Sequence, residues 1–132
     1  MKRLMIAMSL FVLTSIFVFA SDENTFSLNE RGRIDCYGGT VTISPETAEI
    51  FLEGEIMYVI RLENQAMEWT AVSSDANIAV LRKESDSSWA DEKSGTGDNN
   101  LHIKAEGPGT CVITFTRLDN NETETIVVTV IE

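Results

Sequence analysis

The sequence predicts an all-β protein, folded as an antiparallel β-sandwich of seven to eight strands. Two observations lead to this fold class. From residue 41 onward, short apolar segments alternate with polar residues at the two-residue period of a strand, and no segment carries a helical stripe. Residues that favour turns separate these segments, among them the runs Gly107-Pro108-Gly109 and Asp119-Asn120-Asn121.

Eight segments are the expected strands. The first ends at Pro45, which has no backbone N–H for a sheet, and the second ends at Gly54. Polar turn residues end the later ones, for example Asn64-Gln65 before the strand that holds Trp69. In chain order the expected strands are residues 40–44, 49–53, 55–62, 68–73, 77–83, 101–105, 110–118 and 124–131.

The buried face of these strands follows from their alternation. Tyr58 shares one face of its segment with Ile60, and Trp69 shares one face of the next segment with Ala71. A large aromatic side chain gains most from burial, so the indole is expected in the core. We expect a single dry layer between the two sheets, formed by Tyr58, Trp69, Ile103 and Ile113.

The run Ser73-Ser74-Asp75 raises the question of a nucleophilic serine. Such a serine needs a base, and His102 is the only histidine in the chain. His102 alternates with Leu101 and Ile103, so it is expected to point away from the core. Serine and aspartate also bond their own backbone in turns. We therefore expect a turn at this run and no catalytic centre.

The N-terminal residues predict export. Lys2 and Arg3 precede an apolar run at 4–19, and the triplet Val18-Phe19-Ala20 fits a cleavage site. The predicted organisation is a signal peptide at 1–20, an N-terminal extension at 21–40 and the sandwich domain at 41–132. The apolar run is shorter than the roughly 20 residues of a spanning helix. We expect a secreted, periplasmic or cell-surface protein with no membrane span after cleavage.

Charge and composition restrict the partners. The formal net charge is −11 at pH 7 over 132 residues. Nucleic acid needs basic surfaces to displace its counterions, so it is not an expected partner. The single histidine and the absence of closely spaced cysteines also predict no metal or cofactor site.

The two cysteines predict a disulfide. Cys36 and Cys111 both follow the predicted signal peptide, and an even cysteine count in an exported chain is typical of disulfide bonding. Closing a loop of about 75 residues would stabilise the fold by roughly 4 kcal/mol in the chain-entropy model. The bridge would tie the extension to the sandwich.

The polar segment 84–100 is expected to be a long loop, and long loops are often functional. Trp89 is its only large apolar residue. It is either an exposed contact for a protein or a sugar, or it folds back over the sheet. The acidic residues of this segment match no calcium-loop spacing; they are Asp86, Asp91, Glu92 and Asp98.

From residue 41 to the end, the chain resembles the bacterial Ig-like group 2 domain. The matching stretches are VTISPETAEIFLEGE, the tryptophan of EWTAVSSDANIAVL, KAEGPGTCVITF and ETIVVTVI. The resemblance implies an Ig-like sandwich and a role as an adhesion or stalk module of surface and exported proteins. This chain departs from the pattern in its single copy, its extension at 21–40 and its long segment at 84–100.

A second, weaker resemblance is to chagasin-type inhibitors of papain-family cysteine proteases, which are also exported Ig-like sandwiches. Their glycine-rich loop is similar to Gly95-Thr96-Gly97-Asp98, and Arg117-Leu118-Asp119 stands where they carry an Arg-Pro-Trp loop. The segment 63–67 is shorter than their third contact loop.

These features together predict an exported non-catalytic Ig-like module for protein or surface binding, adhesion or envelope assembly. The alternative is a chagasin-like protease inhibitor. The expected partner is a protein or a cell-surface glycan, with a cysteine protease under the alternative, and the oligomeric state stays open. The residues expected to contact a partner are Trp89, Gly95, Gly97, Asp98, Arg117 and Asp119.

Overall fold

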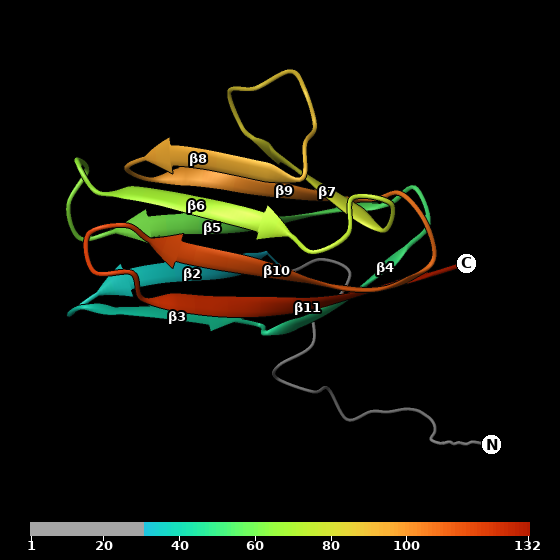
Figure 1. Ribbon diagram of the computed structural model, residues 1–132, viewed down its shortest axis with the longest axis horizontal. Helices are drawn as coiled ribbons and strands as arrows, with labels where there is room; N and C mark the ends of the chain where they lie inside the picture. Colours follow the sequence, from blue (N-terminus) through green and yellow to red (C-terminus); the bar gives the residue numbers. More distant parts are fainter. Residues whose placement is uncertain (1–30) are drawn as a thin grey trace.

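A computed structural model describes residues 31–132, which form ten strands and no helix (Figure 1). The strands are β2 (Gly32–Tyr37), β3 (Thr40–Ser44), β4 (Thr47–Phe51), β5 (Glu55–Leu62), β6 (Glu68–Ser73), β7 (Ala79–Lys83), β8 (Glu92–Thr96), β9 (Asn99–Ala105), β10 (Gly109–Arg117) and β11 (Thr123–Ile131). One sheet has the order β4-β11-β10-β6-β8 and is called the β10 sheet; the other has the order β3-β2-β5-β9-β7 and is called the β5 sheet. The predicted all-β sandwich is confirmed.

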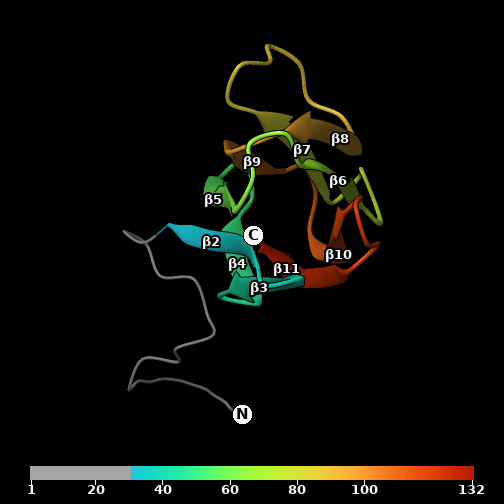
Figure 2. The ribbon, with the colours of Figure 1, turned by 90° about the vertical axis from the view of Figure 1, so that its left-hand side faces the viewer.

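The core lies between the inner faces of the two sheets (Figure 2). Tyr58, Trp69, Ile103 and Ile113 are all 0% exposed, which confirms the predicted dry layer. The Trp69 ring stacks on Phe115 with centroids 5.5 Å apart. Burying each of these large side chains contributes about 2 to 3 kcal/mol to folding.

The eight predicted strands are all present. Segments 40–44, 55–62 and 68–73 agree residue for residue with β3, β5 and β6. The other five shift by one or two residues at one or both ends. The strand expected at 49–53 is Thr47–Phe51, because the chain already turns at Leu52 and Glu53, where Glu53 has φ 70°.

The structure corrects the predicted boundary between extension and sandwich at residue 41. β2 lies between β3 and β5 as an interior strand of its sheet, so the sandwich already includes Gly32. Ile34 and Cys36 point into the core and are 0% exposed. The polar residues that alternate with them, Arg33 and Asp35, made this short strand resemble a polar extension.

Two of the eight strand pairings are parallel, whereas the sequence predicted an antiparallel sandwich. They are β2 with β5 and β4 with β11. Between β3 and β4 the chain crosses from one sheet to the other at Pro45. The Tyr58 hydroxyl donates a buried hydrogen bond of 2.7 Å to the Pro45 carbonyl, which fixes this crossing against the core.

The predicted signal peptide at 1–20 and the first part of the extension, 21–30, lie outside the described residues. Within residues 31–132, the structure contains no helix that is long and apolar enough to cross a membrane.

Candidate binding surface at the loop end

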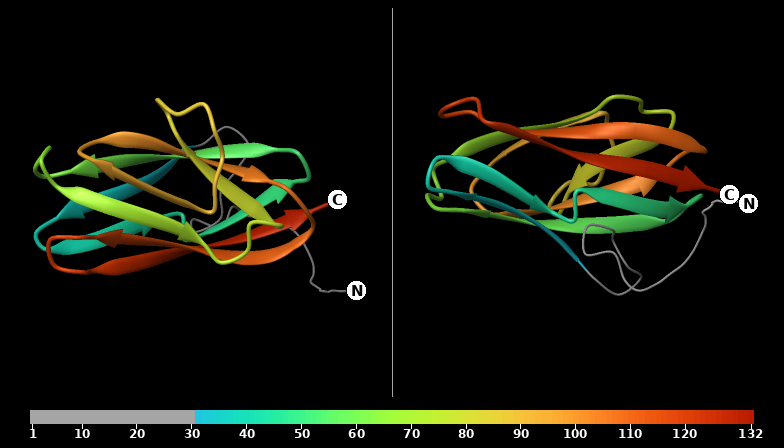
Figure 3. Two further views of the ribbon diagram at one scale, coloured as in Figure 1. Left: turned by 45° about the horizontal axis from the view of Figure 1, so that its top comes forward. Right: turned by 90° about the horizontal axis from the view of Figure 1, so that it is seen from below.

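Four connections lie together at one end of the sandwich, on the left in Figure 1 and in the left view of Figure 3. They are residues 38–39, 63–67, 97–98 and 118–122, and we call this part of the molecule the loop end. β2 runs towards the loop end and β11 runs away from it. Both ends of the described chain therefore leave the sandwich on the side away from the loop end.

Hydrogen bonds fasten the 97–98 turn to the 63–67 connection. The Asp98 carboxylate accepts bonds from the Leu62 N–H at 2.8 Å and from the Gln65 side-chain amide at 2.9 Å. The Asp98 N–H donates to Gln65 Oε1 at 2.8 Å, and the buried Gly97 donates to the Met67 carbonyl at 2.9 Å. Gly97 and Asp98, two of the predicted contact residues, thus hold the loops together.

Arg117 fastens the β10–β11 connection to the β2–β3 turn. Its side chain is only 4% exposed and donates two bonds of 2.8 Å to the Asp119 carboxylate. A further bond of 3.2 Å reaches the Thr40 carbonyl, and Glu63 lies 3.8 Å away. The hydrogen bonds raise the pKa of Arg117 and lower the pKa of Asp119. These two predicted contact residues also belong to the support of the loop end.

The sequence pattern did not predict that the β2–β3 turn belongs to the loop end. Gly38 and Gly39 have φ values of 62° and 80°, as a two-residue hairpin turn of type I′ requires. The Asn120 side chain donates to the Gly39 carbonyl at 3.0 Å. Two adjacent glycines are a signal for such a turn, but they lie within residues 21–40, which the sequence predicts as an extension.

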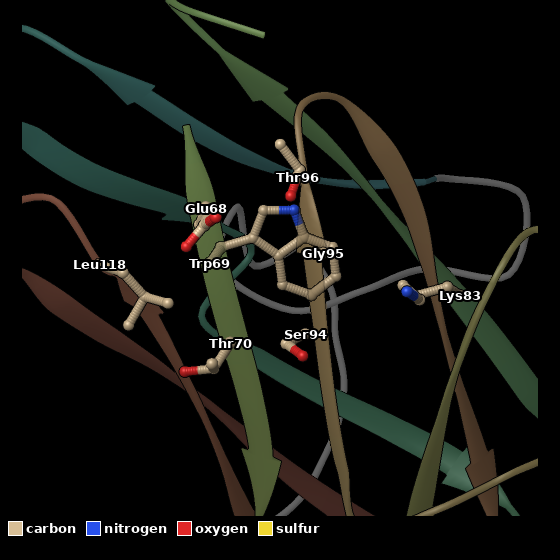
Figure 4. A pocket seen from close by; sticks show the side chains of 8 residues that line it. All are labelled: Glu68, Trp69, Thr70, Lys83, Ser94, Gly95, Thr96 and Leu118. Atoms are coloured by element: carbon tan, nitrogen blue, oxygen red, sulfur yellow. The ribbon is translucent and has the colours of Figure 1, made fainter. Parts of the chain in front are cut away.

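A shallow hollow of about 450 Å³ lies beside the loop end (Figure 4). Leu118, 41% exposed, and Glu68 stand on one side of it in the picture, and Lys83 stands on the other. Gly95 lies next to Trp69, and a Cβ at this position would be 2.5 Å from the indole Cζ2. The lining residues are Glu68, Trp69, Thr70, Lys83, Ser94, Gly95, Thr96 and Leu118.

The predicted long loop at 84–100 is shorter in the structure. Residues 92–96 form β8, which pairs with β6, and β9 begins at Asn99. This strand escaped prediction because its sequence, EKSGT, has no apolar alternation. Only residues 84–91 remain as an irregular connection, and Asp86 binds Lys93 across its base at 3.0 Å. This contact lowers the pKa of Asp86.

Trp89 does not belong to the loop end. It folds back over the outer face of the β5 sheet, where Arg82 Cζ lies 5.1 Å and Lys104 Nζ lies 4.9 Å from its ring centroid. Both cations project outward, between the buried residues of β7 and β9. Such cation–π contacts favour this position over free exposure. Of the two alternatives for Trp89, the structure has the packed one.

The predicted Cys36–Cys111 disulfide is wrong, since both cysteines are free and buried. Each points into the core, but they lie near opposite ends of the sandwich. The Cys36 carbonyl accepts a bond from the Glu63 N–H at the loop end, whereas Cys111 Sγ lies 3.9 Å from Ser73 Oγ. Cys111 is six residues from Arg117 along β10, which corresponds to about 20 Å. A disulfide needs Cα atoms within about 7 Å.

The serine-rich run after β6 is a turn, as predicted. Ser73 Oγ donates to the Ala79 carbonyl at 2.8 Å, and Ser74 Oγ accepts from the Val112 N–H at 2.9 Å. Asp75 bonds the backbone two residues further on, in an Asx turn. The two hydroxyls therefore serve the backbone of neighbouring strands.

His102 lies on the outer face of the β5 sheet, where its Nε2 is 2.8 Å from Glu84 Oε1. This hydrogen bond lowers the pKa of Glu84. Among residues 31–132, no group of three or more histidine, cysteine, aspartate or glutamate side chains could hold a metal ion.

Comparison with known proteins supports the fold alone. No family model matches the chain, and no curated protein matches its sequence. A multicopper oxidase structure is similar over 76% of this chain, with 10% identity and a TM-score of 0.50. Domains 4 and 5 of the S-layer protein SbsC are similar over 73% of this chain, with 11% identity and a TM-score of 0.51. The matches span 42% and 55% of those two chains.

Proposed function

We propose that this protein is an exported, non-catalytic Ig-like module that binds a protein or a surface glycan through its loop end. The observation that carries the proposal is a set of contacts that joins the four connections into one platform. Hydrogen bonds join 63–67 to 97–98 and 118–122 to 38–39, and Glu63 links the two pairs through the Cys36 carbonyl and Arg117. Loops fixed before binding lose little conformational entropy on binding, so their arrangement favours recognition. The N-terminal export pattern and the fold likeness to S-layer domains support a surface location.

The proposed contacts are the side chains that stay exposed above this platform. Ala66, Thr96, Leu118 and Asn120 are exposed, and Leu118 is a large apolar residue beside the hollow. The buried Gly97 and the ion pair of Arg117 and Asp119 hold the loops that carry these side chains. A non-catalytic role agrees with the turn and surface contacts that engage Ser73 and His102.

The test is capture of envelope or culture-medium proteins from the native host with the purified, tagged protein. We expect a captured partner to be lost with the combined variant Ala66→Arg and Leu118→Asp, because both changes alter exposed loop-end side chains. The matched control is Thr42→Glu, an exposed position on the outer face of the β5 sheet. Equal capture by all three proteins would reject the loop end as the binding surface.

The alternative function is inhibition of a papain-family cysteine protease. One observation supports it: the three segments that the chagasin resemblance assigns to the protease cleft, near residues 63–67, 95–98 and 117–119, are neighbours at the loop end. Titration of papain with the purified protein tests it. Inhibition at micromolar concentration that the same combined variant abolishes would favour the inhibitor, and full papain activity would remove it.

A further inference from the structure

The outer face of the β10 sheet carries a broad uncharged area. All nine outward positions of β10 and β11 hold threonine, valine or isoleucine, although the chain has a net charge of −11. These positions are Thr110, Val112, Thr114, Thr116, Thr123, Thr125, Val127, Thr129 and Ile131. Together with Val72 on β6 and Phe51 on β4, we call them the neutral face.

Exposed apolar side chains gather on this face. Seven large hydrophobic residues are exposed in residues 31–132, and four of them belong to the neutral face. Phe51 is 65% exposed, Val72 38%, Val127 36% and Ile131 36%. A fifth, Leu118, lies at its margin beside the hollow. Isolated exposed hydrophobic residues are ordinary, whereas a contiguous group of them marks an interaction surface.

Apart from Phe51, the neutral face is even in height. Its threonine, valine and isoleucine side chains are short and β-branched, so they stand stiffly on the sheet. Thr110 and Thr129 face each other across the strand pair with their hydroxyl oxygens 3.3 Å apart. The outer face of the β5 sheet differs, because it carries long cationic side chains such as Arg33, Arg61 and Lys104.

We propose that the neutral face binds the neutral face of a second copy of this chain, sheet against sheet about a two-fold axis. A two-fold contact places the same surface on both partners. Two acidic copies repel each other, and this face brings no like charges into the centre of the contact. Glu49, Glu68 and Glu92 lie at its rim on β4, β6 and β8, where they stay in water.

The size of the face sets the strength of the contact. Nine residues of strand and three spacings between the four strands that contribute to the face give about 30 Å by about 14 Å, or about 400 Å² for each copy. Two copies would bury about 800 Å², which is below the size of a standard interface and in the range of weak, transient contacts. The dimer is therefore weak and reversible, and repulsion between the acidic rims weakens it further at low salt.

Sedimentation equilibrium of the purified protein tests this proposal, at about 0.1 M and about 1 M NaCl, where the screening length falls from about 10 Å to about 3 Å. We expect a monomer–dimer equilibrium that tightens at the higher salt. Val127→Glu should raise the dimer Kd by about a hundredfold or more, because it buries an unpaired charge. The control Thr42→Glu adds the same charge on the opposite side and should change Kd little.

Circular dichroism of each variant establishes that it is folded, and Thr125→Glu, at an exposed position of the face, replaces Val127→Glu if that variant unfolds. A monomer at every concentration would overturn the proposal. A dimer that the folded face variant leaves intact would overturn it too. So would a dimer that weakens at higher salt, since a charged surface would then make the contact. The variants lie outside the loop end, so the outcome of this experiment and that of the proposed function are independent of each other.

Discussion

At the residue scale, two glycines inside strands make room for the two largest rings of the core. A Cβ on Gly32 would lie 2.3 Å from the Tyr58 ring, and one on Gly95 would lie 2.5 Å from the Trp69 ring. Real side chains do not approach this closely, so each ring occupies the space that a side chain would need. The Trp69 Nε1 also donates to the Gly97 carbonyl at 3.1 Å, which fixes the orientation of the indole.

We expect Gly95→Ala to destabilise the protein by about 1 to 3 kcal/mol, the usual cost of an added methyl group in a packed site. The measurement is the urea midpoint of unfolding followed by tryptophan fluorescence. Ser94→Ala is the matched control, because its neighbouring position on β8 is exposed. A stability equal to that of the parent protein would mean that Trp69 moves aside without cost.

The two cysteines give a second prediction at this scale. Burial raises the pKa of Cys36 to about 11 and also raises the pKa of Cys111, so little reactive thiolate forms at pH 8. We expect no reaction of the native protein with a thiol reagent, and reaction of both thiols after denaturation without reductant. Absence of free thiols in the denatured protein would show instead that Cys36 and Cys111 form a disulfide.

At the scale of elements, Arg117, held by its ion pair with Asp119, joins strand ends that belong to different sheets. β10 supplies Arg117, and its bond to the Thr40 carbonyl reaches the start of β3. The contact therefore connects the two sheets at the loop end, in addition to the core between them. Loss of this contact is expected to loosen the connections before it affects the strands.

The pH dependence of stability follows from this pair. The pKa of Asp119 is lowered from 3.8 in the folded protein. The contribution of Asp119 to the stability of the fold is therefore complete above the unfolded pKa, and it disappears as pH falls through the folded pKa. Urea unfolding of the parent protein and of Asp119→Asn should differ at pH 7 and converge as pH falls below 3.8. A difference that persists unchanged in acid would show that charge does not produce the effect.

At the scale of the whole molecule, the first described strand is an interior member of a sheet. β2 bonds β3 on one side and β5 on the other, and it adds Ile34 and Cys36 to the core. Without β2, the edge strand β3 would lose its only partner strand in the β5 sheet.

A shortened chain that begins at Val41 is therefore expected not to fold, whereas one that begins at Glu30 should fold. Loss of the buried Ile34 side chain alone reduces the stability by about 2 kcal/mol, and loss of the strand pairings of β2 with β3 and β5 adds to this. Circular dichroism and thermal melting of both chains provide the measurement. A cooperative melt of the chain that begins at Val41 would place the start of the sandwich where the sequence pattern had placed it.

The sequence pattern predicted the fold wherever large apolar residues alternate, as in β5 with Tyr58 and Ile60. It failed where a strand contributes few such residues, as in β8, whose place is fixed by pairing with β6 and by the fit of Gly95 against Trp69. The loop end was predicted in outline only. Alternation along a chain predicts which side of a sheet a residue occupies. It does not predict the position of a residue along the sandwich, as for Cys36, or its hydrogen-bond partner, as for Asp98.

The direction of β2 has a mechanical consequence. Because β2 enters from the side on which β11 leaves, tension applied between Gly32 and Ile131 would not stretch the sandwich from one end to the other. It would peel strands away from that side, breaking their hydrogen bonds a few at a time. We therefore expect the module to unfold at low force when its two ends are pulled apart, while the loop end carries none of the load.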